Sequence, residues 1–196
     1  MVKATLREYM KDRETLSVSE AAQETGVSLP TVYSFLKSEG MERLSKGVYA
    51  RPTAWIDEMF LLSQRSKTLI FSHESALFLH NLSDREPNDL TVTVPSNYNA
   101  GNLVKTGIRV YYVKPELIDL GRIECETPEG NRVPSYDLER TICDCVRSRN
   151  KLEEQVFLSA LKSYARRSGK RLDTLARYAE NLGISGVVSR LFEVLL

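Results

Sequence analysis

The chain has 196 residues and a formal net charge of +1, with 42% hydrophobic and 27% charged residues. This length allows one or two domains with a packed core, and these fractions are ordinary for a globular protein. Bulk charge therefore gives no sign of nucleic-acid binding, and three cysteines are too few for a disulfide framework.

The first residues, MVKATLREYMKDRE, lack the apolar core of a secretory signal, and no stretch approaches the length of a membrane span. We therefore predict a cytoplasmic protein that does not enter a membrane. Cys143-x-Cys145 lacks the CxxC spacing of zinc sites and has no second pair, so no metal is predicted. Because these two cysteines cannot share one helix face, we expect one in the core and the other nearer the surface.

The N-terminal quarter has the pattern of three short helices. Residues 4–13 form an amphipathic helix, and Ser17-x-x-Glu20 matches a capping box that would start a second helix. Gly26 is suited to the positive φ of a helix end, and Ser28 with Pro30 is typical of the start of a third helix. This is the spacing of a DNA-reading helix-turn-helix.

The third helix predicts a surface that can hydrogen-bond to bases. Val32 and Phe35 face the helix pair, and the outward positions carry polar side chains. These predicted DNA-binding residues are Ser28, Thr31, Tyr33, Ser34 and Lys37. The alternative is a protein-binding module with polar helix faces.

A hairpin is predicted directly after the third helix, since Leu44 and Val48-Tyr49 flank a turn at Gly47. A hairpin in this position is the wing of a winged helix, and Pro52 marks the end of the domain. Four more basic residues are predicted phosphate contacts: Arg7, Lys11, Arg43 and Lys46. For Arg7 and Lys11 the alternative is a solvated helix face that pairs with Glu8, Asp12 and Glu14. Residues 1–51 hold eight Lys or Arg against seven Asp or Glu, so placement rather than total charge carries the prediction.

The rest of the chain, residues 53–196, predicts an α+β domain with a helical C-terminal part. Helices are expected over 53–67 and 72–81, strands over 90–94 and 108–113, and a hairpin within 124–133. Residues 95–102 (PSNYNAGN) are expected to be a loop. From residue 136 the pattern is helical, with further helices over 152–168, 172–181 and 187–195.

A basic segment, KSYARRSGKR, spans residues 162–171 and contains no acid. It is either a solvated patch that suits a helix C-terminus or an auxiliary nucleic-acid contact that lets DNA bend across the protein. Its basic residues are Lys162, Arg166, Arg167, Lys170 and Arg171.

No motif of catalysis or cofactor binding is found. His73 and His80 are seven residues apart, not at the spacing of HEXXH, and are interpreted as structural. Asp137, Glu139 and Asp144 have no partner motif, and there is no GxGxxG or Walker loop. We predict a protein that is not an enzyme and binds no cofactor.

The chain resembles the AbiE-type antitoxins of bacterial abortive-infection loci. The resemblance runs nearly end to end and rests on VSEAAQETGVSLPTVYSFLKSEGMERLSKGVYA, SHESALFLHNL (72–82), LTVTVP (90–95) and VPSYDLERTICDCV (133–146), in that order and spacing. It implies a winged helix-turn-helix over residues 1–52 and an antitoxin domain over 53–196.

The same resemblance implies a function. Such antitoxins bind inverted repeats of duplex DNA in their own promoter, repress the toxin–antitoxin operon, and counteract a nucleotidyltransferase-like toxin. They are classed as type IV, meaning that they act without a stable toxin complex. A monomer in solution that binds DNA cooperatively fits this picture.

Two other functions are compatible with the sequence. One is a ligand-responsive winged-helix transcription factor whose C-terminal domain senses a small molecule. The other is an enzyme that modifies the toxin or its RNA target, for which the sequence offers no motif.

Overall fold

The computed structural model describes residues 2–83 and 85–195, and it has an α+β fold. The chain divides into two compact units. The first unit comprises the residues up to Lys67 together with Glu126–Val133. The second comprises Thr68–Cys125 and the residues from Pro134 onward. The predicted boundary after residue 52 lies inside the first unit, which also takes a segment from much later in the chain.

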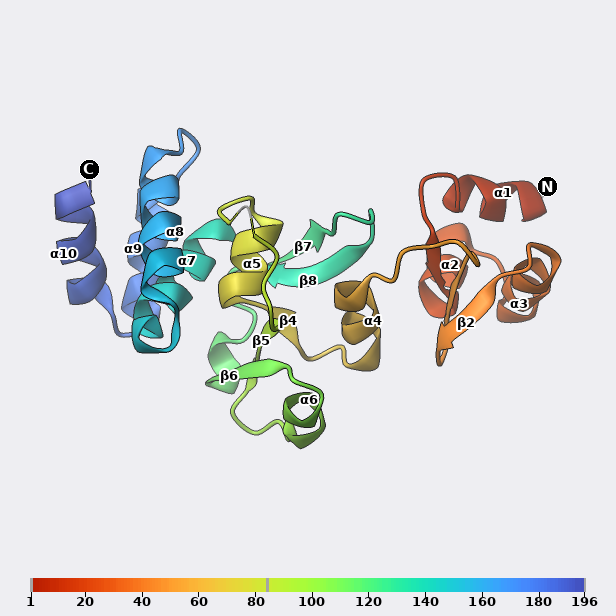
Figure 1. The fold of residues 1–196 in the computed structure, drawn as a ribbon, viewed down its shortest axis with the longest axis horizontal. Coiled ribbons are helices and arrows are strands. Elements are labelled where there is room, and N and C mark those ends of the chain that lie inside the picture. The colour runs from red at the N-terminus through yellow and green to blue at the C-terminus, as the bar shows by residue number, and fades with distance from the viewer. Residues whose placement is uncertain (1, 84, 196) are drawn as a thin grey trace. The chain divides into compact units, whose positions relative to one another are not determined.

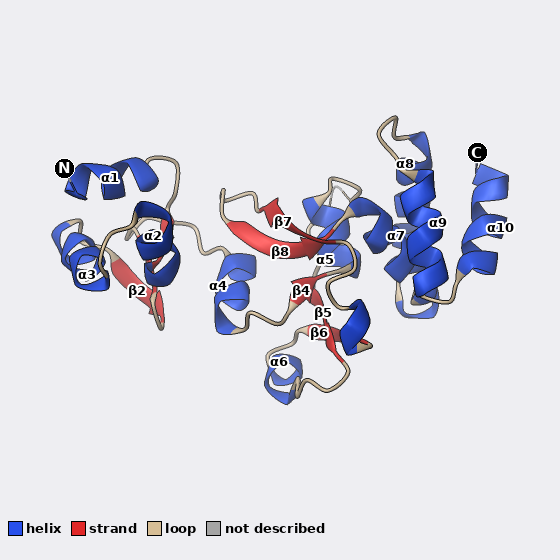
Figure 2. Cartoon of the chain, turned by 180° about the vertical axis from the view of Figure 1, so that it is seen from behind, coloured by secondary structure: helices blue, strands red, loops and turns tan. Residues whose placement is uncertain are grey.

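The first unit contains three helices and a three-stranded antiparallel sheet, followed by a fourth helix (Figure 2). Its elements are α1 (Val2–Tyr9), β1 (Thr15–Ser17), α2 (Val18–Thr25), α3 (Leu29–Ser38), β2 (Glu42–Ser45), β3 (Val48–Ala50) and α4 (Glu58–Arg65).

The turn between α2 and α3 forms at Gly26, as predicted. Gly26 has φ of 67°, a left-handed conformation that a residue with a Cβ adopts only at a cost. The predicted capping box is wrong: Ser17 stands at the N-cap of α2 but makes no cap hydrogen bond. Its hydroxyl instead donates to Oε1 of Gln64 at 3.0 Å, and the Glu20 carboxylate accepts from Nε2 of Gln64 at 2.8 Å. Ser17 and Glu20 therefore bond to Gln64 of α4 and do not cap α2.

The predicted hairpin is present as β2 and β3, with a two-residue loop, Lys46-Gly47, between the paired Ser45 and Val48. Gly47 has φ of 77°, as tight hairpin loops require. The sheet has the order β1-β3-β2, so β1 pairs with β3 on the side away from β2. The strand β1 was not predicted, because three residues directly before a helix carry too little alternation to be recognised.

The core of the first unit lies between its helices and its sheet. The buried apolar residues are Leu6, Met10, Leu16, Val18, Ala21, Val32, Phe35 and Leu36. The helix α4 is shorter than predicted and starts at Glu58, after the N-cap residue Asp57, whose Oδ1 accepts from the backbone N–H of Phe60 at 2.8 Å. The predicted helical residue Trp55 lies before it and is 85% exposed.

The loop at 127–131 is tied into the first unit by hydrogen bonds. Oδ2 of the buried Asp57 accepts from Oγ1 of Thr127 at 2.6 Å and from Nδ2 of Asn131 at 2.8 Å. Oδ1 of Asn131 in turn accepts from Oγ1 of Thr15 at 2.8 Å. Polar groups taken out of water need such partners, so this loop completes the interior of the unit.

The second unit is built on a five-stranded mixed sheet of order β6-β5-β4-β8-β7. The strand β4 pairs antiparallel with β5 and parallel with β8, and β5 pairs parallel with β6. Its strands are β4 (Ile70–Phe71), β5 (Thr91–Pro95), β6 (Arg109–Val113), β7 (Arg122–Glu126) and β8 (Arg132–Tyr136), of which the last residue of β7 and the first two of β8 are counted with the first unit. The strands predicted over 90–94 and 108–113 and the hairpin in 124–133 are confirmed within two or three residues.

The helices of this unit include a group of three at the C-terminal end of the chain, where α8, α9 and α10 stand side by side (Figure 1). The helix α6 was not predicted: it begins at Gly101, inside the segment expected to be a loop. The helices are α5 (His73–Leu79), α6 (Gly101–Lys105), α7 (Leu138–Arg147), α8 (Glu154–Arg166), α9 (Leu172–Asn181) and α10 (Ser185–Leu195).

The helix α7 is buried on every side. All residues from Glu139 to Val146 are buried, and both Cys143 and Cys145 have 0% exposure. The prediction that one of these cysteines lies nearer the surface is therefore wrong. It assumed one solvent-facing side for this helix, whereas α5, α8 and α9 pack around it. Across the described residues, no helix is both long and apolar enough to cross a membrane.

Candidate nucleic-acid interface

The exposed side of α3 forms one continuous face. Leu29, Tyr33 and Lys37 follow each other at intervals of four residues, and Pro30 and Ser34 lie beside them. All five are exposed, whereas Val32, Phe35 and Leu36 occupy the buried side. We call these five residues the α3 face.

The predicted polar residues of this helix lie where they were expected. Ser28, Tyr33, Ser34 and Lys37 are exposed and Thr31 is half-buried. The hydroxyls of Ser28 and Thr31 are 2.8 Å apart and hydrogen-bond to each other, so Ser28 does not cap the helix with its side chain. The ring of Tyr33 stands edge-on to Tyr49 of β3, with 6.2 Å between ring centroids.

Two basic residues lie on the hairpin that follows α3. Lys46 is exposed in the loop between β2 and β3, and Arg43 is exposed on β2. Nε of Arg43 donates to the carbonyl of Ser45 at 3.1 Å, and Gly47 accepts from the backbone N–H of Val18 at 2.8 Å. The second contact holds the hairpin loop against the start of α2, whereas the first lies within β2.

Ion pairs divide the basic side chains described within residues 5–51 into two groups. Arg7, Lys11, Arg13 and Arg51 each have a carboxylate within 4.0 Å, with Glu39, Glu8, Glu24 and Glu14 as the respective partners. Lys37, Arg43 and Lys46 have no such partner among the residues described. The uncompensated positive charge therefore lies on α3 and the hairpin.

The predicted contacts on α1 and directly after it, Arg7 and Lys11, are engaged within the protein. Arg7 donates from Nη2 and Nε to Oε1 of Glu39, at 2.9 and 3.2 Å, near the C-terminal end of α3. Lys11 lies 3.8 Å from Glu8. Both basic side chains are 67% exposed, so these ion pairs are exposed to solvent and weak.

The basic segment 162–171 divides in a similar way. Arg171 pairs with Asp137 and Glu139, Nη2 of Arg167 donates to the carbonyl of His80 at 2.9 Å, and Lys170 donates to the carbonyl of Arg167. Burial raises the pKa of Glu139, but the hydrogen bonds from Arg171 outweigh it and hold that pKa below its usual value. Lys162 and Arg166 are exposed, with no acidic partner among the described residues.

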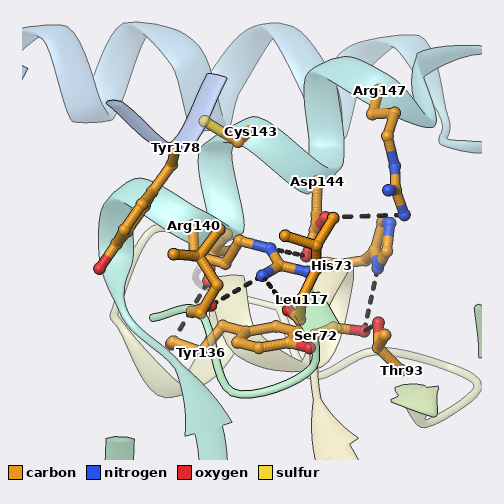
Figure 3. Close-up of polar contacts among 12 residues, drawn as sticks. Ser72, His73, Thr93, Leu117, Tyr136, Arg140, Cys143, Asp144, Arg147 and Tyr178 are labelled. Atoms are coloured by element: carbon orange, nitrogen blue, oxygen red, sulfur yellow. Dashed lines mark hydrogen bonds and ion pairs between the residues drawn. The ribbon is translucent and has the colours of Figure 1, made fainter. Parts of the chain in front are cut away.

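A buried polar cluster in the second unit was missed by sequence reasoning (Figure 3). Arg140 donates from Nε to Asp144 at 3.0 Å, donates from Nη1 to the carbonyls of Leu117 and Leu120, and lies over the Tyr136 ring. Burial raises the pKa of Asp144, against the attraction of Arg140 and Arg147. The available signal was the presence of charged residues between apolar ones in α7, and of these Arg140 fixes the segment before β7.

Both histidines, predicted to be structural, are hydrogen-bonded within the protein, and Nε2 of His80 lies 2.7 Å from the carbonyl oxygen of Tyr136. His73 is fully buried with φ of 48°, and its ring stacks on Tyr111 with 3.5 Å between centroids. It is hydrogen-bonded with Ser72 and Ser148, and Ser72 also accepts from Thr93 (Figure 3). Burial, together with the nearby Arg147 and Arg140, lowers the pKa of His73 well below its usual value.

A polar cleft of about 220 Å³ opens in the second unit. Arg109 bridges it, donating to Glu74 at 2.8 Å and to Asp89 at 3.2 Å. Other charged lining residues are Arg85, Glu86, Lys151 and Glu153. Among the described residues, no group of three or more His, Cys, Asp or Glu side chains is placed to hold a metal ion.

Comparisons with known proteins identify a protein of similar fold but no family. No family model matches the chain, and no curated protein matches it. A similar solved structure is that of the RV2827C protein from Mycobacterium tuberculosis, with a TM-score of 0.54 and 14% sequence identity. The match covers 91% of this chain and 69% of that protein. At this identity the likeness supports the α+β fold alone.

Proposed function

We propose that the first unit is a winged helix-turn-helix that binds duplex DNA. In this proposal α3 is the recognition helix, which enters the major groove, and the β2–β3 hairpin is the wing. One observation carries it: the described basic side chains without an acidic partner in residues 5–51 are Lys37, Arg43 and Lys46, all on these two elements. Phosphate contacts need such uncompensated charge.

The wider role that we propose is an antitoxin that represses its own operon. It is based on the resemblance to AbiE-type antitoxins, in which the winged helix binds inverted repeats and the toxin is nucleotidyltransferase-like. Two copies would occupy an inverted repeat, each reading one half-site. The antitoxin role is assigned to the residues that follow the winged helix, acting without a stable toxin complex.

The test of DNA binding is a gel-shift salt titration with the DNA upstream of the gene. Full-length protein is compared with the variant Lys37→Glu/Arg43→Glu/Lys46→Glu and with a control of equal charge change, Lys105→Glu/Lys114→Glu/Arg149→Glu. The control residues are exposed and belong to the second unit. We expect the first variant to lose affinity and to flatten the salt dependence by about 0.9 in slope per lost phosphate contact. Equal affinity and equal salt dependence of the two variants would show that Lys37, Arg43 and Lys46 do not contact DNA.

Antitoxicity is tested separately, in cells that express the neighbouring toxin gene. The full-length triple variant, expressed from an unrelated promoter, is expected to rescue growth as well as the wild type does. Full-length protein is preferred to a fragment cut after residue 52, because Asp57, Thr127 and Asn131 belong to the first unit. Loss of rescue in the triple variant would show that protection acts through repression.

A second candidate function is a transcription factor that responds to a small polar ligand. The cleft that Arg109 bridges favours it, because charged groups of both signs line a space large enough for a small molecule. A thermal-shift screen of charged metabolites tests this candidate. A hit that disappears in Arg109→Gln and changes operator affinity would favour it over the antitoxin.

A further inference from the structure

The N-terminal turns of α3 present apolar side chains to solvent. Leu29 is 51% exposed and Tyr33 is 48% exposed, one turn apart, with the exposed ring of Pro30 beside them. Exposed leucine at the start of a helix contributes nothing to the core of this unit, which Val32, Phe35 and Leu36 supply from the other side. In a recognition helix, the N-terminal residues are the ones that reach base edges.

The same turns lack the side chains that read guanine or adenine. Guanine is read by the paired donors of Arg or by Lys, and adenine by the amide of Asn or Gln. Residues 27–36, VSLPTVYSFL, contain none of these four types. Lys37 comes only in the last turn of α3, where it is suited to phosphate.

The hydroxyl groups at this end are partly committed to each other. Ser28 and Thr31 hydrogen-bond to each other at 2.8 Å, which leaves the hydroxyls of Ser34 and Tyr33 as the polar side-chain groups in these turns of the α3 face. Tyr33 itself is braced edge-on by Tyr49, so its ring is held against the sheet. What this end of α3 offers to a groove is therefore mostly apolar surface.

Thymine is the base that presents an apolar group in the major groove, its C5 methyl. We infer that the α3 face selects duplex DNA with thymine at the contacted positions, with Leu29 and Tyr33 packing on thymine methyl groups. This inference is based on the proposed DNA-binding function and names the base class that the same face reads. Leu29 becomes a specificity-determining residue, whereas Lys37, Arg43 and Lys46 supply affinity regardless of sequence.

The test uses deoxyuridine, which differs from thymidine only by the missing methyl. Full-length protein is used to enrich duplexes from a random-sequence pool, and the enriched duplex is remade with deoxyuridine in place of thymidine. We expect thymines in each enriched half-site and a loss of about fourfold in affinity for each contacted methyl removed. The variant Leu29→Ala is expected to bind more weakly to the thymidine duplex and to lose most of this discrimination.

Leu172→Ala provides the matched control, because Leu172 also starts a helix and is 41% exposed, but in the second unit. It is expected to keep the full preference for thymidine over deoxyuridine. Enrichment of duplexes that bind equally well with either base would overturn the inference and leave DNA binding intact. Failure to enrich any duplex, with no binding at low salt, would instead overturn the proposed function.

Discussion

Asp57 and Asn131 are 74 residues apart in the chain, and Nδ2 of Asn131 donates a hydrogen bond of 2.8 Å to Oδ2 of Asp57. Thr127 donates to the same oxygen, while the other oxygen of Asp57 caps α4. One buried carboxylate thus holds the start of a helix and the tip of a distant loop within one unit.

The first prediction concerns this carboxylate. Asp57→Ala removes the cap of α4 and leaves the donors of Thr127 and Asn131 without their acceptor. We expect a loss of about 2–4 kcal/mol in the free energy of unfolding. Urea denaturation followed by circular dichroism measures it, and Glu58→Ala is the control, since Glu58 is exposed one residue later. Equal stability of both variants would show that the loop is not held by Asp57.

The second prediction ranks single charge changes within the proposed DNA face. Arg7 already pairs with Glu39, whereas Lys46 has no acidic partner among the described residues. Lys46→Gln is therefore expected to weaken DNA binding more than Arg7→Gln does, with a slope change of about 0.9 for one phosphate contact. Salt titrations of the two variants side by side decide the order, and a larger effect at Arg7 would place the DNA along α1.

The third prediction concerns Gly121, which has φ of 78° and touches α7. A Cβ built at this position would lie 2.7 Å from Cβ of Arg140 and 3.1 Å from Oδ1 of Asp137. Gly121→Ala is therefore expected to cost about 2–4 kcal/mol in the free energy of unfolding. The matched control is Gly186→Ala in α10, where a Cβ meets nothing within 4 Å. The control is expected to stabilise the protein by up to about 1 kcal/mol, because alanine favours a helix. Thermal and urea unfolding of both variants provide the comparison.

The fourth prediction is a loss of stability in mild acid. Burial lowers the pKa of both His73 and His80 in the folded protein, so between pH 6.5 and the lowered values the unfolded chain binds more protons. The stabilisation is complete above about pH 6.5 and is lost as the pH falls through this range, by about 1.4 kcal/mol per pH unit for each histidine at most. Urea unfolding at pH 7.0 and 5.5 measures it.

The variant His73→Asn isolates one contribution to this pH dependence. Asparagine tolerates the positive φ of this position and does not titrate. The variant is expected to be less stable at pH 7.0 but to show a flatter pH dependence. The raised pKa of Asp144 acts in the opposite sense, because it favours the folded state as the pH falls. An unchanged slope in the variant would show that folding does not lower the pKa of His73.

The fifth prediction concerns the thiols. Cys143 and Cys145 are fully buried, and burial raises the pKa of Cys143 to about 12, whereas Cys125 is only partly buried. A thiol reagent is expected to label one cysteine in the native protein and three after denaturation. In Cys125→Ser, native labelling is expected to disappear. Labelling of two or more thiols in the folded wild type would contradict the enclosed α7.

Sequence patterns correctly predicted the turns and helices that depend only on neighbouring residues. The turn at Gly26, the hairpin at Gly47 and the bounds of α9 all depend on glycine conformation or helical periodicity within a few residues. The distant partners of Ser17, Asp57 and Arg140 could not be read in this way, because they lie 47, 74 and 23 residues away in the chain. Arg140 shows the difference most clearly, because it is fully buried and two of its acceptors are the carbonyls of Leu117 and Leu120.

For the candidate DNA-binding site, the sequence likewise predicted the positions of the residues but not their partners. The outward positions of α3 follow from periodicity, and Lys37 and Lys46 were expected to be exposed. Two properties of this site could be seen only in the structure. Only the ion pairs distinguish Lys37 and Lys46 from Arg7, and only the structure shows that Leu29 is 51% exposed beside Tyr33.

The return of residues 126–133 to the first unit has a consequence for synthesis on the ribosome. Folding of N-terminal domains normally begins as soon as they emerge. Here the acceptor at Asp57 appears early, and its donors at Thr127 and Asn131 are translated only after most of the second unit's sheet. During synthesis, Asp57 therefore waits many seconds without these two donors, and the first unit cannot complete its interior before they emerge. A gene fusion that replaced the N-terminal residues alone would leave the loop at 127–131 without its acceptor.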